Sequence, residues 1–204
     1  LQVSMHPTQG LPATPADPRQ ALSRVVDRLK ADGFHPVMAV ELEFYLLDKQ
    51  RDANGRPQPA LQMNGIRPEA PQVYGVYELE QLQPFLDDLY AACEVQGLPV
   101  RTAISEYAPG QVELTLEHRF DVMQAIDEGV RYKRLVKGVA HKHGMQACFM
   151  AKPFDDLAGT GMHMHVSLAD AEGNNLYASE DPAGTPLLRQ SVGGMLKSLL
   201  DSLL

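Results

Sequence analysis

The chain has 204 residues, of which 44% are hydrophobic and 22% charged, and its formal net charge is −8. This length allows one or two domains with a buried core, and the acidic balance, with scattered Lys and Arg residues, argues against nucleic acid as a partner. The two cysteines, Cys93 and Cys148, are too few for a disulfide framework and favour a reducing compartment.

The sequence shows no pattern of a membrane span or of a signal peptide. No window has the apolar length of a membrane span, and residues 1–10 lack the charged start and apolar run of a signal peptide. We therefore expect a cytoplasmic protein that does not contact a membrane. The start at Leu1 and a final helical pattern without a stop signal suggest an excerpt of a longer protein.

The N-terminal part of the sequence predicts a helix, a long strand and a loop. After a Pro-rich lead segment over 1–18, apolar residues recur at helical spacing over 19–32, and Gly33 can end this helix. Residues 35–48 are rich in Val, Leu, Phe and Tyr and predict a strand. Four prolines and turn-forming residues predict a long surface loop over 51–75.

The rest of the sequence alternates between helical and strand patterns. The longest predicted helix covers residues 121–143. Its inward-facing residues should be Met123, Ile126, Val130, Leu135 and Val139. We expect an α+β fold in which a mainly antiparallel sheet, with charged side chains on its inner face, is flanked by helices. The predicted segments are a helix over 78–96 in which Pro84 can cause a kink or a late start, one or two strands over 100–117, a helix over 121–143, strands over 145–151 and 162–168, a hairpin turn over 170–175 and a helix from Pro186.

Carboxylates lie at two places where the pattern predicts strands. Glu41 and Glu43 are two residues apart, so both side chains project from the same side of a strand. Glu106 and Glu113 flank a turn at Pro109-Gly110, which can bring two strands together. Each pair alone is also typical of solvent-facing or turn-flanking residues, but the apolar residues on both sides of Glu41 and Glu43 indicate burial.

A third motif places imidazoles on a strand. His163, His165 and Ser167 alternate along one face, and Gly159 and Gly161 precede them, where a ligand can approach the backbone closely. A pair of half-buried structural histidines is the plainer interpretation of this spacing. Two carboxylates about 4 Å apart repel by about 4 kcal/mol at an effective dielectric constant of 20, so the converging charges favour a bound divalent cation.

The identity of the expected ion follows from the ligand types. The His-x-His spacing suits zinc as well as magnesium or manganese. Because carboxylates dominate the set, the harder ions Mg²⁺ and Mn²⁺ are favoured.

Four motifs, in this order, resemble the catalytic domain of the glutamine synthetase family. The motifs cover most of the chain. Within the family, the sequences of Gly159–His163 and Glu172–Asn175 are most similar to those of the glutamate-polyamine ligases, which include the gamma-glutamylputrescine synthetases. The motifs are Glu41-Leu-Glu-Phe-Tyr45, Glu106-Tyr-Ala-Pro-Gly-Gln-Val-Glu113, Phe149-Met-Ala-Lys-Pro153 and Gly159-Thr-Gly-Met-His-Met-His-Val-Ser-Leu168.

The resemblance implies a site with two divalent cations, Mg²⁺ or Mn²⁺, and ATP as a co-substrate. Glu43, Glu106 and Glu113 would be catalytic and hold the first ion. The second ion, which contacts the ATP phosphates, would be held by Glu41 and His163. The resemblance further assigns His165 and Ser167 to ATP and the backbone of Gly159 to glutamate.

The implied reaction is an ATP-dependent ligation in which glutamate becomes gamma-glutamyl phosphate and is then attacked by an amine. The resemblance favours putrescine or another polyamine as this amine. Ammonia is the alternative amine, which would place the enzyme in nitrogen assimilation rather than polyamine catabolism. A non-catalytic relative and an ATP-independent metallohydrolase are further alternatives.

The resemblance implies that residues 1–204 are the N-terminal part of a catalytic domain that is truncated at both ends. We expect this part alone to be inactive and the full-length protein to form a homo-oligomeric ring.

Overall fold

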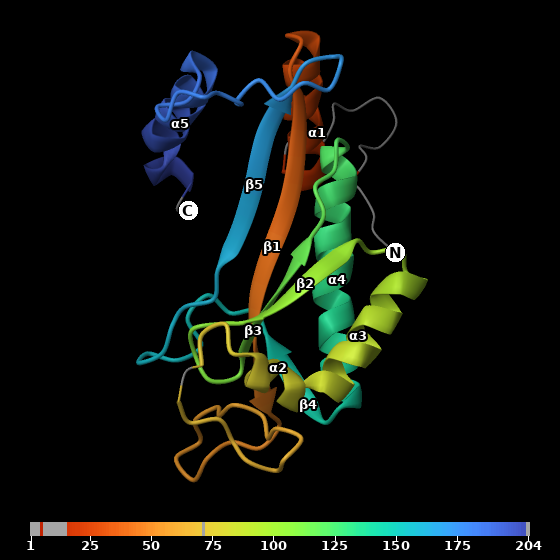
Figure 1. The fold of residues 1–204 in the computed structure, drawn as a ribbon, viewed down its shortest axis with the longest axis vertical. Helices are drawn as coiled ribbons and strands as arrows, with labels where there is room; N and C mark the ends of the chain where they lie inside the picture. The colour runs from red at the N-terminus through yellow and green to blue at the C-terminus, as the bar shows by residue number, and fades with distance from the viewer. Residues whose placement is uncertain (1–4, 6–15, 71, 203–204) are drawn as a thin grey trace. The chain divides into compact units, whose positions relative to one another are not determined.

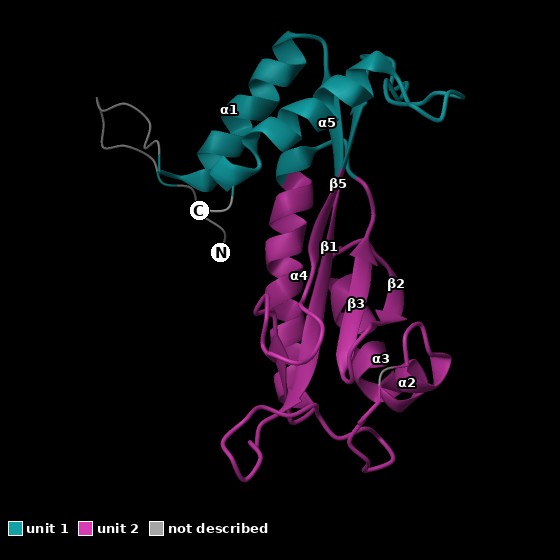
Figure 2. Cartoon of the chain, turned by 90° about the vertical axis from the view of Figure 1, so that its left-hand side faces the viewer, with its two compact units in different colours: residues 1–38, 119–123, 166–204 teal, residues 39–118, 124–165 magenta. Residues whose placement is uncertain are grey.

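The computed structural model describes residue 5, residues 16–70 and residues 72–202 (Figure 1). Two compact units divide the chain (Figure 2). Unit 1 comprises residues 1–38, 119–123 and 166–204, and unit 2 comprises residues 39–118 and 124–165. Most of the predicted lead segment lies outside the described residues, whereas the predicted carboxylates all belong to unit 2.

The predicted α+β class and mainly antiparallel sheet are confirmed. The strands pair in the order β2-β3-β1-β4, and β5 also pairs with β1. The pairs β1–β3, β1–β4 and β2–β3 are antiparallel. The elements of the described residues are α1 (Pro18–Ala31), β1 (His35–Asp48), α2 (Val76–Gln81), α3 (Gln83–Val95), β2 (Val100–Ser105), β3 (Gln111–Leu116), α4 (Val122–Lys142), β4 (Met145–Cys148), β5 (Met162–Ala169), α5 (Pro186–Ser198) and the 3-10 turn η1 (Leu200–Ser202).

Local side-chain chemistry fixes the ends of the helices in unit 1. The Asp17 carboxylate accepts hydrogen bonds from the backbone N–H groups of Arg19 and Gln20 and so caps the start of α1. Gly33 follows the helix with φ +83°, a conformation that glycine adopts without steric cost, as the sequence predicts. Thr185 caps α5 in the same way as Asp17 caps α1, through its hydroxyl and the N–H of Leu188.

The helix predicted over 78–96 is interrupted near Pro84, where the sequence allows a kink or a late start, and the structure has two helices there. α2 ends at Gln81, and α3 begins at Gln83 with Pro84 in its first turn. A proline has no N–H to donate and its ring excludes the preceding helical turn, so it is tolerated only where a helix begins. The long loop between β1 and α2 contains no further helix or named strand among its described residues.

The inward face predicted for α4 is wrong at Val130, whose side chain is 55% exposed. The buried stripe instead runs through Ala125, Gly129, Tyr132 and Val136. A Cβ on Gly129 would lie 3.6 Å from side-chain atoms of Val40 in β1, so this position of the helix faces the sheet. None of the described helices combines the length and the apolar character needed to cross a membrane.

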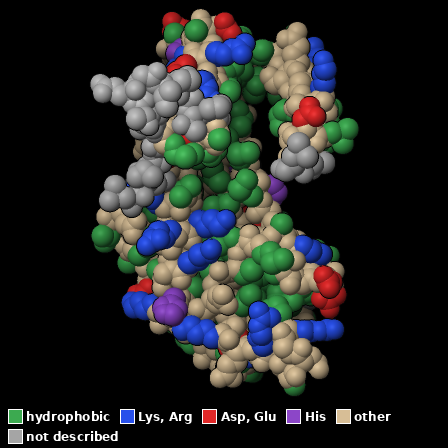
Figure 3. Space-filling view, turned by 180° about the vertical axis from the view of Figure 1, so that it is seen from behind, with side chains coloured by type: hydrophobic (Ala, Val, Ile, Leu, Met, Phe, Trp, Pro, Cys, Tyr) green, Lys and Arg blue, Asp and Glu red, His purple; other side chains and the backbone are tan. Residues whose placement is uncertain are grey.

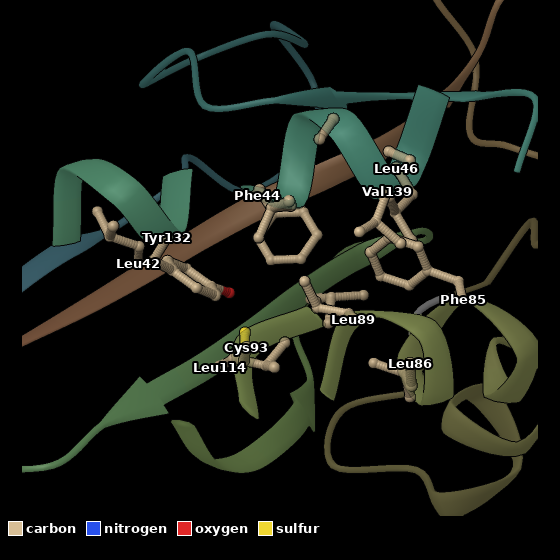
Figure 4. Close-up of a cluster of buried hydrophobic side chains, with 14 of the residues drawn as sticks. Leu42, Phe44, Leu46, Phe85, Leu86, Leu89, Cys93, Leu114, Tyr132 and Val139 are labelled. Atoms are coloured by element: carbon tan, nitrogen blue, oxygen red, sulfur yellow. The ribbon is translucent and has the colours of Figure 1, made fainter. Parts of the chain in front are cut away.

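The hydrophobic core of unit 2 lies between the sheet and the helices α3 and α4 (Figure 4). Phe44 of β1 packs edge to face against Phe85 of α3, with ring centroids 6.4 Å apart. Figure 4 shows Leu89 pointing to the same cluster and Tyr132 entering it from α4. Burial of these large side chains anchors both helices to one face of the sheet.

The period of two along each strand separates the core from a polar face. In β1, the even-numbered residues Leu42, Phe44 and Leu46 are in the core cluster. In β3, Val112, Leu114 and Leu116 occupy the equivalent positions. The odd-numbered residues of both strands therefore project from the opposite face of the sheet, and these include Glu41, Glu43 and Glu113.

Basic side chains gather on a different part of unit 2, although the sequence predicts scattered Lys and Arg residues. Residues 129–154 contain six Lys or Arg and no Asp or Glu. Lys133 and Lys137 of α4 lie over the ring of Phe149, at 5.2 and 5.9 Å from its centroid. The view from behind shows several Lys and Arg side chains on the surface of this unit (Figure 3).

Candidate metal centre

The pairing of β1 with β3 brings three glutamates together. Glu43 lies directly opposite Glu113, and Glu41 lies opposite Thr115. Because side chains on directly opposed positions of antiparallel strands lie within about 5.5 Å at Cβ, Glu43 and Glu113 are neighbours on the polar face. Glu41 is the diagonal neighbour of Glu113 on the same face. Glu113 is 3% exposed, so its carboxyl group has little access to water.

Glu106 reaches this group through the loop that joins β2 to β3. Its N–H donates to the carbonyl of Gln111 at 2.9 Å, which closes the loop. Gly110 turns the chain with φ +75°, and a Cβ there would lie 3.1 Å from the carbonyl oxygen of Leu46. This turn therefore requires glycine, and it returns the chain so that Glu106 and Glu113 lie together, as the spacing around Pro109-Gly110 predicts.

The two histidines of β5 reach the Glu41 carboxylate. His163 Nδ1 is 3.3 Å from Glu41 Oε1, and His165 Nε2 is 2.5 Å from Glu41 Oε2. Both imidazoles are more than half exposed, whereas the Glu41 side chain is largely covered. One carboxylate thus holds two imidazoles on the same side of the strand, as their alternate positions require.

Ligand-type atoms gather in two overlapping groups in the described part of the chain. The first group contains Glu43, Glu106 and Glu113, and the second contains Glu41, Glu113 and His163; within each group the nearest oxygen or nitrogen atoms lie within 4.8 Å of one another. These groups contain all five predicted ion ligands. The structure adds Glu113 to the second group, so that one carboxylate belongs to both.

Burial and mutual repulsion perturb the protonation of these carboxyl groups. Burial, the hydrogen bond with Glu41 and the charges of the neighbouring carboxylates together raise the pKa of Glu113 to about 8. Burial also raises the pKa of Glu106, with the Glu43 charge acting in the same direction. Burial acts to raise the pKa of Glu41 as well, but hydrogen bonds with His165, Glu113 and His163 outweigh it and lower this pKa.

The donor set fits a hard divalent cation. Three carboxylates within one ligand sphere, one of them protonated near neutral pH without an ion, match the oxygen ligands that Mg²⁺ and Mn²⁺ prefer. An ion there would offset a repulsion of about 4 kcal/mol for each pair of carboxylates 4 Å apart at an effective dielectric constant of 20. The second group, with an imidazole, also suits Mn²⁺ or Zn²⁺.

The glycine-containing segment 157–161 is held against the polar face. The N–H of Gly161 donates to Glu43 Oε2 at 2.8 Å, and a Cβ on Gly161 would lie 2.6 Å from Glu43 Oε1. The hydroxyl of Tyr45 donates to the carbonyl of Ala158 at 2.6 Å. Burial, with the Glu43 charge, raises the pKa of Tyr45 to about 12, so this donor keeps its proton. Glycine at 161 therefore permits close approach of the backbone to a carboxylate of the protein itself.

Sequence reasoning missed two residues at this site. Gln111 donates its amide N–H to Glu43 Oε2 at 2.6 Å. His118 stacks edge to face on His165, with ring centroids 6.0 Å apart. The alternation along β3 could have identified Gln111, because it is two residues from Glu113, whereas nothing in the sequence around His118 indicates its place.

Two further predicted contacts remain predictions. The carbonyl of Gly159 accepts a hydrogen bond from Gln111, and the contact of the Gly159 backbone with glutamate remains a prediction. Ser167 is half-buried on β5 and belongs to unit 1, so the site is described without it.

Comparison with known proteins agrees with these motifs. The family model for the glutamine synthetase catalytic domain matches residues 15–204. Gamma-glutamylputrescine synthetase PuuA of Escherichia coli (strain K12) is 40% identical over 188 residues, which is 92% of this chain and 40% of PuuA. Type-1 glutamine synthetase 1 of Dictyostelium discoideum is 35% identical over 184 residues, 88% of this chain and 36% of that protein.

A solved structure shares the fold. The GmaS/ADP complex superposes with a TM-score of 0.79 at 29% identity, over 94% of this chain and 42% of that chain. The chain therefore spans about two fifths of the length of the proteins that it matches. With a match to the family model over nearly all its residues, the chain belongs to the glutamine synthetase family and contains part of its catalytic domain.

Proposed function

We propose that the full-length protein containing this chain is an ATP-dependent ligase that joins glutamate to an amine through gamma-glutamyl phosphate. The observation that carries the proposal is the convergence of five predicted ligands into two groups that share Glu113. Such a site suits phosphoryl transfer, in which catalysis consists mainly of positioning the reactants and stabilising negative charge. The relatives named as glutamate-amine ligases support the same reaction class.

The side chains of the first group would hold one ion, and those of the second group the other. When bound, the ions would neutralise the phosphate charge that develops during the transfer. Glu43 is held by the N–H of Gly161 and the amide of Gln111, so its carboxylate has a fixed orientation before any ion binds. His163 and His165 both contact Glu41 and limit its rotation.

For the substrates, we propose that His165 and Ser167 contact ATP and that the backbone of Gly159 contacts glutamate. The neighbouring Ala158 carbonyl is held by the Tyr45 hydroxyl, and the Gly159 carbonyl by Gln111. Both anchors restrain the backbone that would present the N–H of Gly159 to a bound carboxylate.

Putrescine or a related polyamine is the amine that we favour. The identity to gamma-glutamylputrescine synthetase PuuA, at 40%, exceeds that to the type-1 glutamine synthetase, at 35%. Other relatives are named glutamate–isopropylamine ligase and gamma-glutamylethanolamide synthetase, which supports an alkyl amine. The protein would then act in polyamine catabolism. We also propose a ring-shaped homo-oligomer in the reducing cytoplasm, and both free cysteines suit that compartment.

The test is product formation by the full-length protein with ATP, glutamate, Mg²⁺ or Mn²⁺, and either putrescine or ammonia. Gamma-glutamylputrescine and ADP, identified by mass, are the expected products. Glutamine as the only product would assign the ammonia-dependent reaction instead. Turnover of a phosphate ester or amide without ATP would support a metallohydrolase, and no turnover with any amine would support a non-catalytic relative. Residues 1–204 alone should form no product.

A further inference from the structure

Gln111 has every hydrogen-bonding group of its side chain engaged at the centre of the polar face. The residue is 2% exposed. Its amide nitrogen donates to Glu43 Oε2 at 2.6 Å and to the carbonyl of Gly159 at 3.0 Å, and its amide oxygen accepts from the N–H of Ala108 at 3.2 Å. The side chain therefore joins a predicted ion ligand, the glycine-containing segment and the β2–β3 loop.

These partners determine which way the amide points. The NH₂ group faces two acceptors, a carboxylate and a carbonyl, while the oxygen faces a donor. Rotating the amide by half a turn would set its oxygen against both acceptors and its NH₂ against the N–H of Ala108. A buried amide in the reversed orientation would leave all its groups unpaired, so the observed orientation is fixed.

We propose that Gln111 is a positioning residue that orients the Glu43 carboxylate for the first ion and links it to the segment that contains Gly159. The inference rests on the proposed function. Both hydrogen bonds described for Glu43, from Gln111 and from the N–H of Gly161, go to Oε2. Neither of these two hydrogen bonds uses Oε1, and Glu43 forms a ligand group with Glu106 and Glu113.

The same amide explains how ion binding and the glycine-containing segment depend on each other. A shift of Glu43 would move the amide of Gln111, which also holds the carbonyl of Gly159. The main chain at Gly159 is where we propose that glutamate binds. Loss of the amide should therefore weaken the ion site and loosen residues 158–161 together, whereas a side chain that only fills space would affect neither.

The experiment compares two variants of buried glutamines in the full-length protein. Gln111→Met keeps the length of the side chain and removes its donors. Gln62→Met is the matched control, because Gln62 is 8% exposed and donates its amide to Glu78 outside the ion ligands. Mn²⁺ affinity is measured by electron paramagnetic resonance, and backbone mobility by hydrogen exchange of residues 158–161.

Gln111→Met should lower Mn²⁺ affinity by roughly 10-fold, within the range for partners that orient metal ligands, and should speed exchange at residues 158–161. Gln62→Met should leave both unchanged. In a Glu43→Gln background, Gln111→Met should have little further effect on Mn²⁺ affinity, because its effect passes through Glu43. If Gln111→Met does not fold, Gln111→Asn replaces it, since the shorter amide cannot reach all three partners.

A folded Gln111 variant with the Mn²⁺ affinity and exchange rates of the wild type would overturn the inference. Equal effects from Gln62→Met would also overturn it, because they would show a general loss of stability. Absence of Mn²⁺ binding by the wild type is a different result, which would contradict the proposed ion site itself.

Discussion

The two faces of β1 have opposite physical environments. Leu42, Phe44 and Leu46 are packed against α3 and α4, and each adds to the stability of the fold. Glu41 and Glu43, on the other face, are partly buried carboxylates close to Glu113, whose burial raises its pKa when no ion is bound. The comparison shows that the alternation of side chains along β1 places core residues on one face and the predicted ion ligands on the other. Substitutions can therefore test each face separately.

The core face should give the largest effect on stability. Phe44→Ala removes a fully buried ring that packs against Phe85 and Phe149, and should lower the free energy of unfolding by about 3–5 kcal/mol. Urea denaturation monitored by circular dichroism measures this loss. A cost well below 1 kcal/mol would show that this face is not the core.

Gly161→Ala tests the polar face at its tightest contact. The added Cβ would lie 2.6 Å from Glu43 Oε1, so the carboxylate must move away from its position. Mn²⁺ affinity should fall roughly 10-fold, the order expected when a metal ligand is misplaced. Gly138→Ala is the control, because a Cβ there meets nothing within 4 Å. Equal affinities in both variants would contradict the placement of Glu43.

The polar face should also make the stability of the ion-free protein depend on pH. Burial and the neighbouring carboxylates raise the pKa of Glu113 to about 8 from an ordinary value of 4.5, so the folded chain holds a proton that the unfolded chain releases. This contribution to stability is complete below the unfolded pKa and is lost as the pH rises through the folded pKa. Glu106 acts in the same direction, whereas the lowered pKa of Glu41 acts in the opposite one.

The measurement is urea denaturation with EDTA between about pH 5 and pH 8, for the wild type and for Glu113→Gln. The difference between the two proteins isolates the Glu113 carboxyl group. The wild type should lose stability relative to Glu113→Gln as the pH rises. A constant difference across this range would show that Glu113 does not hold a proton in the folded state.

The smallest expected effect is at Tyr45, whose hydroxyl donates to the carbonyl of Ala158. Tyr45→Phe keeps the ring in its contact with Phe154 and removes one hydrogen bond, so stability should fall by about 1 kcal/mol. Thermal denaturation measures the change. A much larger loss would indicate that the hydroxyl has a wider structural role than holding residues 157–161.

Much of the polar face could be predicted from the sequence, because alternation along a strand is a local property. The predicted strand over 35–48 has the bounds of β1, and the same period places Glu41 and Glu43 together. The register that sets Glu43 against Glu113 could not be predicted, since it depends on the β2–β3 loop and on long-range pairing. Whether these residues bind ions stays a prediction.

The errors have identifiable physical causes. Val130 was expected in the core from the helical spacing of apolar residues, but the buried stripe of α4 runs through Gly129, and Val130 lies outside this stripe. The sequence allowed a kink or a late start at Pro84 but could not place the break at Leu82, because the apolar pattern runs through both α2 and α3. Gln111 was missed because an amide has no charge that would mark it as part of a site.

The most direct test of the central claim is the number of Mn²⁺ ions bound by the full-length protein and by three variants. The account predicts two ions for the wild type. Glu106→Gln should weaken one ion, His163→Ala should weaken the other, and Glu113→Gln should weaken both, because Glu113 belongs to both groups. Two ions bound with unchanged affinity by Glu113→Gln would contradict the shared role of this carboxylate and with it the proposed site.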